Sequence, residues 1–155
     1  MDGVDAVSIT VGGDETVWFS TYDSGALFQW PDISRRVADG VHDMWADGSG
    51  TLWVSGAAEA SGGWHLYRMV EGKLVLEATM ESTMVTDMAF GSDGQIWAVS
   101  SGSGIHHFDG TSWTVVEVDT EVIRSPVVNS VVVAADGSVW FGTASGILHF
   151  KPEGG

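Results

Sequence analysis

Cysteine is absent from this chain of 155 residues, and basic residues are scarce. Without cysteine the fold cannot depend on disulfide bonds or thiol chemistry, although this leaves the cellular compartment open. Six Lys and Arg residues stand against 21 Asp and Glu residues, which gives a net charge of −15. A surface of this charge repels phosphate backbones and anionic membranes, so we expect neither nucleic acid nor a membrane as a partner.

Long apolar runs are also absent. No stretch of 18 apolar residues occurs, and the opening MDGVDAVS lacks the basic and apolar regions of an export signal. We therefore expect no membrane span and no signal peptide in this chain. What the chain does contain is 44% hydrophobic residues and eight tryptophans, a composition typical of a packed protein.

Four of the tryptophans end a recurring phrase. The copies are GDETVW (13–18), GSGTLW (48–53), SDGQIW (92–97) and ADGSVW (135–140). The four Trp residues are therefore separated by 35, 44 and 43 residues. A repeat of about 40–45 residues indicates stacked supersecondary units, and it matches the four-stranded blade of a β-propeller.

The residues before each Trp align without a gap. Three columns, twelve, nine and seven residues upstream, are apolar in every copy: Ala6, Val41, Val85, Val128; Ile9, Met44, Met88, Val131; Val11, Ala46, Phe90, Val133. This pattern predicts a first strand buried on both faces. Asp-Gly or Ser-Gly then predicts a tight hairpin turn into the Trp strand. Glu15 replaces Gly in the first copy, so we expect a different turn there.

After each Trp strand, a third strand follows a glycine, and a fourth is clear only at 73–79 and 112–118. The segment 33–38 is a weak fourth strand, and the last copy has none. We predict an all-β fold, a β-propeller of about four antiparallel four-stranded blades, the last without its outer strand. The blades would cover 6–39, 40–80, 84–120 and 127–151 of a single domain, 1–155. A sandwich would not require Trp in the same column of every unit.

Each blade buries both faces against its neighbours, so an open half-ring would expose two apolar faces. Two chains joined head to tail would close an eight-bladed ring. We predict this homodimer. A closed four-bladed monomer and a piece of a longer propeller are the alternatives.

A polar patch is predicted where the first strands begin. Ten residues before Trp stand Ser8, Asp43, Asp87 and Ser130, and the neighbouring column holds Val7, His42, Thr86 and Asn129. The first strand of a propeller blade is the innermost, so these polar side chains would gather at one mouth of the central channel. They could bind a small polar ligand, or a divalent cation through oxygen. Alternatively, they bond local backbone groups and tie blades together. No cofactor is implied.

Two aromatic residues outside the repeat columns, Trp30 and Trp64, could stack on a sugar, although packing alone would also account for them. The histidines after the aligned glycines form a second set: His65, His106, His107 and His149. Adjacent strand residues point to opposite faces, so His106 and His107 cannot share one site. We expect these rings to fill the space between blades.

The phrase D-G-x-[VIL]-W-x-G-T-x-x-G-[IL] at 136–147 resembles the two-component regulator propeller repeat. ITVGGDETVWFST at 9–21 is similar to the repeat of virginiamycin B lyase. The first resemblance implies a non-enzymatic binding module, secreted or periplasmic. The second implies, as an alternative, a lyase with a His base and a divalent cation. A purely structural, self-assembling unit is the third possibility. No nucleophile motif is present, so the sequence favours a protein that is not an enzyme.

Overall fold

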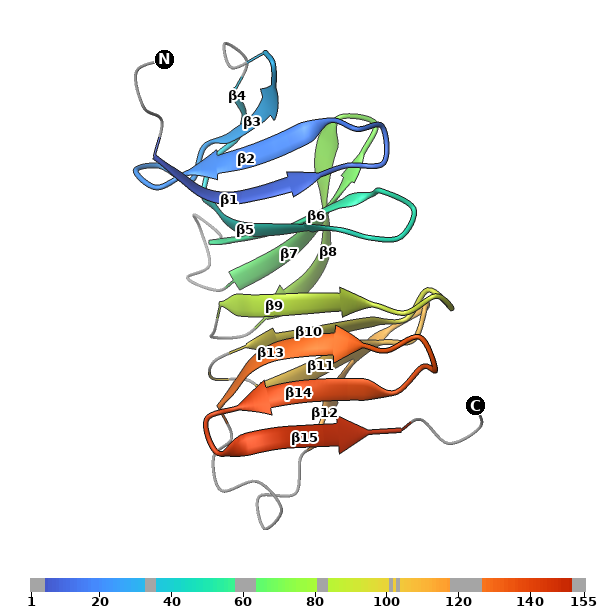
Figure 1. Cartoon of the computed structure of the whole chain (residues 1–155). Coiled ribbons are helices and arrows are strands. Elements are labelled where there is room, and N and C mark those ends of the chain that lie inside the picture. Colours follow the sequence, from blue (N-terminus) through green and yellow to red (C-terminus); the bar gives the residue numbers. More distant parts are fainter. Residues whose placement is uncertain are drawn as a thin grey trace. The chain divides into compact units, whose positions relative to one another are not determined.

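The computed structural model describes residues 5–32, 36–57, 64–80, 84–100, 102, 104–117 and 127–151. All elements in these ranges are strands, and no helix long and apolar enough to cross a membrane occurs in them. The strands form four antiparallel sheets (Figure 1). The chain divides into an N-terminal unit, Met1–Glu81, and a C-terminal unit, Ser82–Gly155, with two sheets each. The predicted all-β class is confirmed, while the single domain over 1–155 stays a prediction.

The N-terminal unit holds two four-stranded sheets in which neighbours in sequence are neighbours in space. The first contains β1 (Ala6–Val11), β2 (Val17–Thr21), β3 (Leu27–Trp30) and β4 (Arg36–Ala38). The second contains β5 (Val41–Ala46), β6 (Leu52–Ala57), β7 (Trp64–Val70) and β8 (Lys73–Met80). The weakly predicted fourth strand of the first copy is thus real, but only three residues long.

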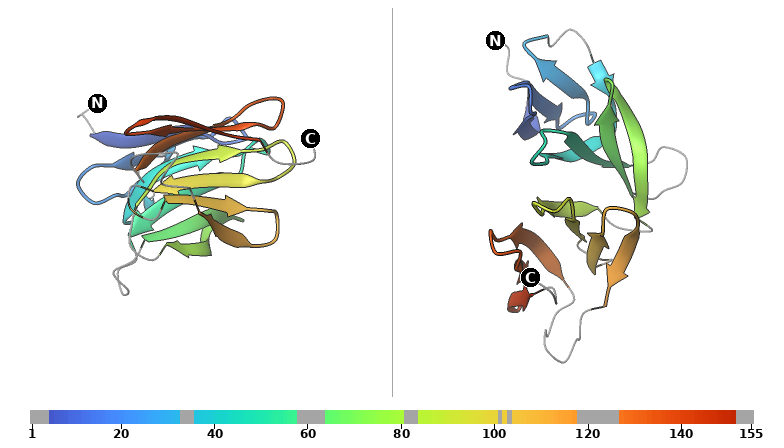
Figure 2. Two further views of the ribbon diagram at one scale, coloured as in Figure 1. Left: turned by 90° about the horizontal axis from the view of Figure 1, so that it is seen from below. Right: turned by 90° about the vertical axis from the view of Figure 1, so that its right-hand side faces the viewer.

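The C-terminal unit repeats this plan with one strand fewer among the described residues. Its first sheet contains β9 (Val85–Phe90), β10 (Ile96–Ser100), β11 (Gly104–Phe108) and β12 (Trp113–Val116). Its second sheet contains β13 (Val128–Val133), β14 (Val139–Thr143) and β15 (Gly146–Phe150). Figure 2 shows the twist of each of these sheets from two further sides. The three-stranded last sheet was predicted, because no fourth strand pattern follows 150.

The hairpin turn before each Trp strand is the same in all four copies. In each, the amide six residues before Trp donates to the carbonyl two residues before it, as from Gly12 to Thr16 at 2.8 Å. The amide three residues before Trp donates back across the turn, and only that residue has a positive φ. This is the three-residue hairpin that ends in a left-handed residue. Glu15 adopts φ 61° there, so the prediction of a different first turn is wrong.

Glu15 therefore occupies a conformation that favours glycine. The equivalent positions hold Gly50, Gly94 and Gly137, with φ between 80° and 85°. We expect Glu15→Gly to raise the free energy of unfolding by about 1 kcal/mol, because relief of backbone strain exceeds the added entropy of the unfolded chain. Urea denaturation measures this. Gly137→Glu is the matched reverse change and should lower the value. A stabilising Gly137→Glu would contradict the assignment.

Each unit has its own core between its two sheets. We call the side of a sheet that carries the repeat Trp its Trp face, and the other side its back face. In the N-terminal unit, Leu27 and Trp18 on the first Trp face pack on the second back face. In the C-terminal unit, the Trp97 face packs on the back face of β13–β15. The residues of those back faces are Met44, Leu52 and Val54 in one unit and Val131, Val139 and Phe141 in the other.

The first strand of each sheet was predicted to be buried on both faces, and the first sheet differs from this prediction. Ile9 is 68% exposed and Val11 is 55% exposed, whereas Met44 and Val131, which share the column of Ile9 and face the core of their own unit, are buried. The expectation of a doubly buried first strand is therefore wrong for β1, and it is also wrong for β13, where Val132 is 57% exposed. The back face of β1 has no sheet against it among the described residues of its unit.

Candidate functional site

The two polar columns coincide with a β-bulge in every sheet. The register of the innermost pair of strands shifts between Ala6 and Ser8, between Val41 and Asp43, and between Val128 and Ser130. In the remaining sheet, β10 shifts its register between Val99 and Ser100. The extra residues are Val7, His42, Thr86 and Asn129. A bulge re-aims side chains and interrupts the ladder, which is why bulges recur at functional sites.

In the N-terminal unit this point holds a hydrogen-bonded pair from neighbouring sheets. The Ser8 hydroxyl donates to Oδ1 of Asp43 over 2.5 Å. The backbone amide of Met44 donates to the same oxygen at 2.9 Å. Ser8 and Asp43 are both half-buried. The structure thus joins two predicted site residues, and their bond also ties β1 to β5.

His42 and Trp64 meet at the same end of the second sheet. Their rings lie edge to face with centroids 5.4 Å apart. Trp64 pairs with Ala57 on β6, next to Gly56, which pairs with Val41. Nδ1 of His42 is buried and has no hydrogen-bond partner in the described part of the chain. A buried ring nitrogen without a partner is uncommon in folded proteins, and here it marks the bulged end of β5 beside an aromatic ring.

In the C-terminal unit, Asp87 is the aspartate of the column, and it links β9 to β13 through hydrogen bonds to the backbone. Oδ1 of Asp87 accepts from the amide of Met88 and Oδ2 accepts from the amide of Val131, both at 2.9 Å. The Thr86 hydroxyl donates to the carbonyl of Val99 at 3.2 Å. Both oxygens of Asp87 therefore serve the backbone. This geometry agrees with the structural alternative for Asp87 more than with a ligand-binding role.

Asn129 and Ser130 precede Val131, which is bonded to Asp87, and both are exposed. Ser130 pairs with Gly142 across the strands. A Cβ at position 142 would lie 2.4 Å from the Ser130 hydroxyl, so glycine leaves the space that this hydroxyl occupies. The exposed polar surface of the column in this unit is therefore formed by Asn129 and Ser130.

Trp30, the remaining predicted site residue, lies elsewhere. It pairs with Val17 on β2, which in turn pairs with Val11 at the far end of β1. Ser8 stands near the start of that strand, so Trp30 and Ser8 lie at opposite ends of the sheet. Trp30 does not contribute to the polar site of its unit.

Two of the predicted histidines, His107 and His149, pack against repeat tryptophans, whereas His65 contacts Tyr67 and His106 pairs with Ala98. His107 stacks on Trp97 with ring centroids 4.1 Å apart, and His149 stacks on Trp140 at 4.0 Å. Nε2 of His107 also lies 2.6 Å from Oε1 of Gln95. Sequence analysis did not pair these rings, although the strand register places each directly opposite its Trp. In the described residues, no three His, Asp or Glu side chains gather as a metal site.

Burial lowers the pKa of His106 and His107 below the ordinary value of 6.5. The unfolded chain then binds more protons than the folded chain once the pH falls through that value. We expect the unfolding free energy of the C-terminal unit to reach its maximum above about pH 7 and to decrease as the pH falls toward about 5.5. Urea midpoints across this range measure the effect. Replacing both histidines with glutamine should flatten the dependence, and an unchanged slope in that variant would contradict it.

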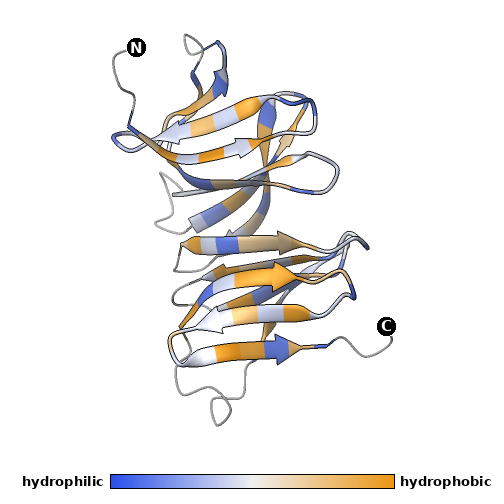
Figure 3. Cartoon of the chain, viewed as in Figure 1, coloured by the Kyte–Doolittle hydropathy of each residue, from blue (hydrophilic) through white to orange (hydrophobic). Residues whose placement is uncertain are grey.

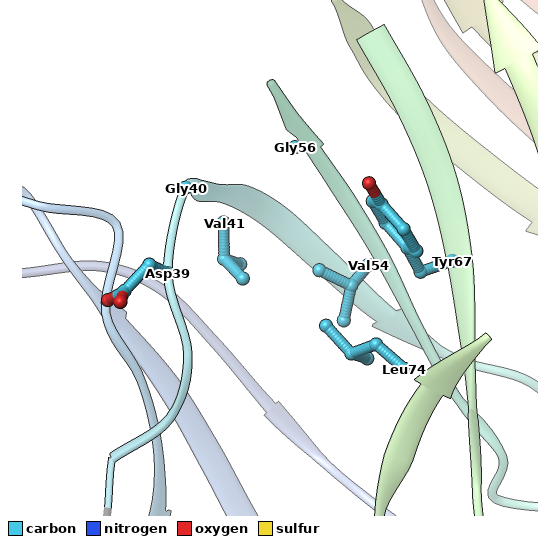
Figure 4. Close-up of a pocket in the computed structure, with 7 residues that line it drawn as sticks. All are labelled: Asp39, Gly40, Val41, Val54, Gly56, Tyr67 and Leu74. Carbon is cyan, nitrogen blue, oxygen red and sulfur yellow. The ribbon is translucent and has the colours of Figure 1, made fainter. Parts of the chain in front are cut away.

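A small pocket, missed by sequence analysis, lies where β4 passes into β5. It has a volume of about 220 Å³ and lies in the N-terminal unit. Figure 4 shows Val41, Val54 and Leu74 converging beside the Tyr67 ring, with the Asp39 carboxylate turned away. Asp39 pairs with Arg36. The pocket exposes about as much polar as apolar surface, and its volume is below the range of about 300–1,000 Å³ that drug-sized ligands occupy.

No family model matches this chain, and no curated protein matches it. Solved structures do. The extracellular domain of the one component system BT4673 from B. thetaiotaomicron superposes with a TM-score of 0.70 and 16% identity, over 93% of this chain and 21% of that one. Regucalcin, a calcium-binding protein from Agrobacterium tumefaciens, superposes with a TM-score of 0.68 and 16% identity, over 97% of this chain and 58% of that one.

Virginiamycin B lyase from Staphylococcus aureus gives a TM-score of 0.65 and 15% identity, over 97% of this chain and 57% of that one. The chain thus spans between about a fifth and three fifths of the length of these proteins. The predicted likeness to two-component regulator and virginiamycin B lyase propellers is confirmed at the level of the fold. The four sheets of this chain are β-propeller blades.

Proposed function

We propose that the chain is a non-enzymatic binding module that takes a small polar ligand at the bulged ends of its innermost strands. The observation that supports this most directly is the recurrence of the bulge at the same column of all four sheets. A bulge interrupts strand pairing, and its repetition presents polar side chains where a regular ladder would not. In the N-terminal unit these are Ser8, Asp43 and His42, with Trp64 beside them. In the C-terminal unit they are Asn129 and Ser130.

The chemistry of these side chains defines the ligand class. In the N-terminal unit, hydroxyl, carboxylate and imidazole groups next to an indole suit a neutral sugar or another polyhydroxy compound. The net charge of −15 disfavours anions. Among the structural neighbours, the extracellular domain of a one component system supports a ligand-sensing role and a location outside the cytoplasm.

An enzymatic role of the lyase kind is less well supported by this structure. Such a role requires a histidine that can reach a substrate as a base. His107 and His149 instead stack on tryptophans, and His107 also contacts Gln95.

Thermal unfolding with a panel of neutral mono- and oligosaccharides tests the proposal. A bound sugar should raise the melting temperature, because it stabilises only the folded state. His42→Ala and Trp64→Ala should each abolish the shift in the N-terminal unit. Thr79→Ala, an exposed position on the outer strand β8, is the control and should keep it. If no sugar raises the melting temperature of the folded protein, or if the increase survives both site substitutions, the proposal is wrong.

A further inference from the structure

Two sheet faces, one in each unit, expose apolar side chains, and some of these have buried equivalents on the other sheet of the same unit: Met44 for Ile9, and Trp97 and Ile105 for Trp140 and Ile147. The first is the back face of β1–β4, where Ile9 is 68%, Val11 55% and Trp30 42% exposed. The second is the Trp face of β13–β15, where Trp140 is 40%, Val132 57% and Ile147 76% exposed. Figure 3 shows hydrophobic bands on β1, β2, β13, β14 and β15. Neighbouring exposed apolar side chains of this kind are typical of interaction surfaces.

The Trp face of β13–β15 has the same construction as a face that is covered. Trp140 lies flat on His149, and its indole N–H donates to the Ser138 hydroxyl at 3.1 Å. The covered counterpart is Trp97, which lies flat on His107. Both indoles are therefore held in the same way by the cross-strand histidine.

The contacts of Trp97 show which side chains pack on a covered Trp face. Its ring lies 5.6 Å from Phe141 and 5.4 Å from Phe150, both on the back face of the following sheet. Phe141 is the first residue after its repeat Trp, and Phe150 pairs across the strand with Val139, the residue before that Trp. Two aromatic rings of a back face thus enclose the indole of a Trp face.

The exposed back face of β1–β4 offers the same two rings at the same two positions. Phe19 follows its repeat Trp as Phe141 does, and Trp30 pairs with Val17 as Phe150 pairs with Val139. Phe19 is already fixed by stacking on Phe28 at 5.5 Å. The remaining counterparts are Ile9 for Val131 and Val11 for Val133. The two exposed faces therefore match, position by position, the two halves of the interface between β9–β12 and β13–β15.

The charge distribution agrees with this pairing. The chain has 21 acidic residues among 155, yet neither face carries one at the positions named. The side chains concerned are Ile9, Val11, Val17, Phe19, Phe28 and Trp30 on one face, and Val132, Trp140, Ile147 and His149 on the other. One charged side chain, Arg36 on the outer strand β4, lies on the back face of β1–β4, where it pairs with Phe28 and forms an ion pair with Asp39. Depletion of charge is the compositional mark of an interface core.

We infer that the occupant of each face is a second copy of this chain. The Trp face of β13–β15 of one copy packs on the back face of β1–β4 of the other, with Trp140 enclosed by Phe19 and Trp30 of its partner copy. Because the two halves differ, the contact is head to tail, and a closed dimer makes it twice. This goes beyond the proposed ligand binding, which does not depend on it.

Light scattering on the purified full chain, together with sedimentation, tests the inference. We expect a species of twice the 16.4 kDa of one chain. Phe19→Glu and Trp140→Glu should each weaken its formation at least tenfold, because each places a charge in the apolar contact. Val115→Glu, on the outer strand β12 and 62% exposed, is the matched control and should remain dimeric. Circular dichroism verifies that the variants fold.

Mixing the two variants gives the sharpest result. Phe19→Glu leaves the Trp face of β13–β15 intact, and Trp140→Glu leaves the back face of β1–β4 intact. An equimolar mixture should therefore form a two-chain species through one head-to-tail contact. A face that paired with its own copy would give one monomeric and one dimeric variant, which would overturn the inference. So would a monomeric wild type, or a mass that grows with concentration without limit.

Discussion

Replacing Phe141 with alanine should lower the unfolding free energy of the C-terminal unit by about 3–5 kcal/mol. Phe141 is 1% exposed and lies at the centre of the core between the two sheets of this unit. Its ring contacts Trp97, which is 3% exposed. The substitution removes the buried area of the ring and leaves a cavity between two rigid sheets, which cannot collapse to fill it.

Urea denaturation followed by circular dichroism and tryptophan fluorescence measures this loss. Val115→Ala provides the control, since Val115 is 62% exposed on β12 and its truncation should change the free energy by less than about 0.5 kcal/mol. Equal effects of the two substitutions would show that the sheets of this unit do not share a core.

The second large effect is expected at Asp87. Asp87→Ala should cost about 2–3 kcal/mol, because it leaves the amides of Met88 and Val131 without their acceptor. The Val131 bond joins β9 to β13, so its loss also weakens the contact between the two sheets. The same denaturation measurement reports it.

Asp87→Asn separates charge from geometry, because the amide oxygen can still accept one of the two bonds. We expect a cost between those of the wild type and Asp87→Ala. Glu117→Ala removes an exposed carboxylate just after β12 and should have little effect. A ligand-binding aspartate would behave differently, since its removal commonly leaves stability unchanged or raises it.

The sheets could be predicted because the repeat appears directly in the sequence. Trp18, Trp53, Trp97 and Trp140 mark β2, β6, β10 and β14, and the apolar columns before them mark the preceding strands. The absence of a fourth strand pattern after Phe150 predicted the three-stranded last sheet. In each case the pattern is local, since strand alternation and turn residues are set by neighbours in sequence.

Other features depend on partners that a single repeat does not contain. Ile9 and Val131 occupy the same column, yet one is exposed and the other buried, because only Val131 has a sheet against it among the described residues of its unit. The backbone bond from Val131 to Asp87 spans 44 positions, so no local pattern reveals it. Glu15 follows the backbone of its glycine counterparts because the turn's hydrogen bonds determine its conformation.

The position of the candidate site could be predicted in part, because the repeats align without a gap. The polar columns fall at one end of the first strands, and that end follows from alignment alone. The bulge that singles out His42, Thr86 and Asn129 results from pairing with the next strand, and the meeting of His42 with Trp64 depends on the hairpin to β7. Neither could be inferred from composition or spacing.

Proton–proton contacts of the Trp97 indole test most directly whether successive repeats stack with the Trp face of one sheet on the back face of the next. Nuclear Overhauser spectra should connect this indole to the rings of Phe141 and Phe150, on another sheet. They should also connect it to His107 on its own sheet. Contacts to His107 without any to Phe141 or Phe150 would contradict the stacking of the repeats.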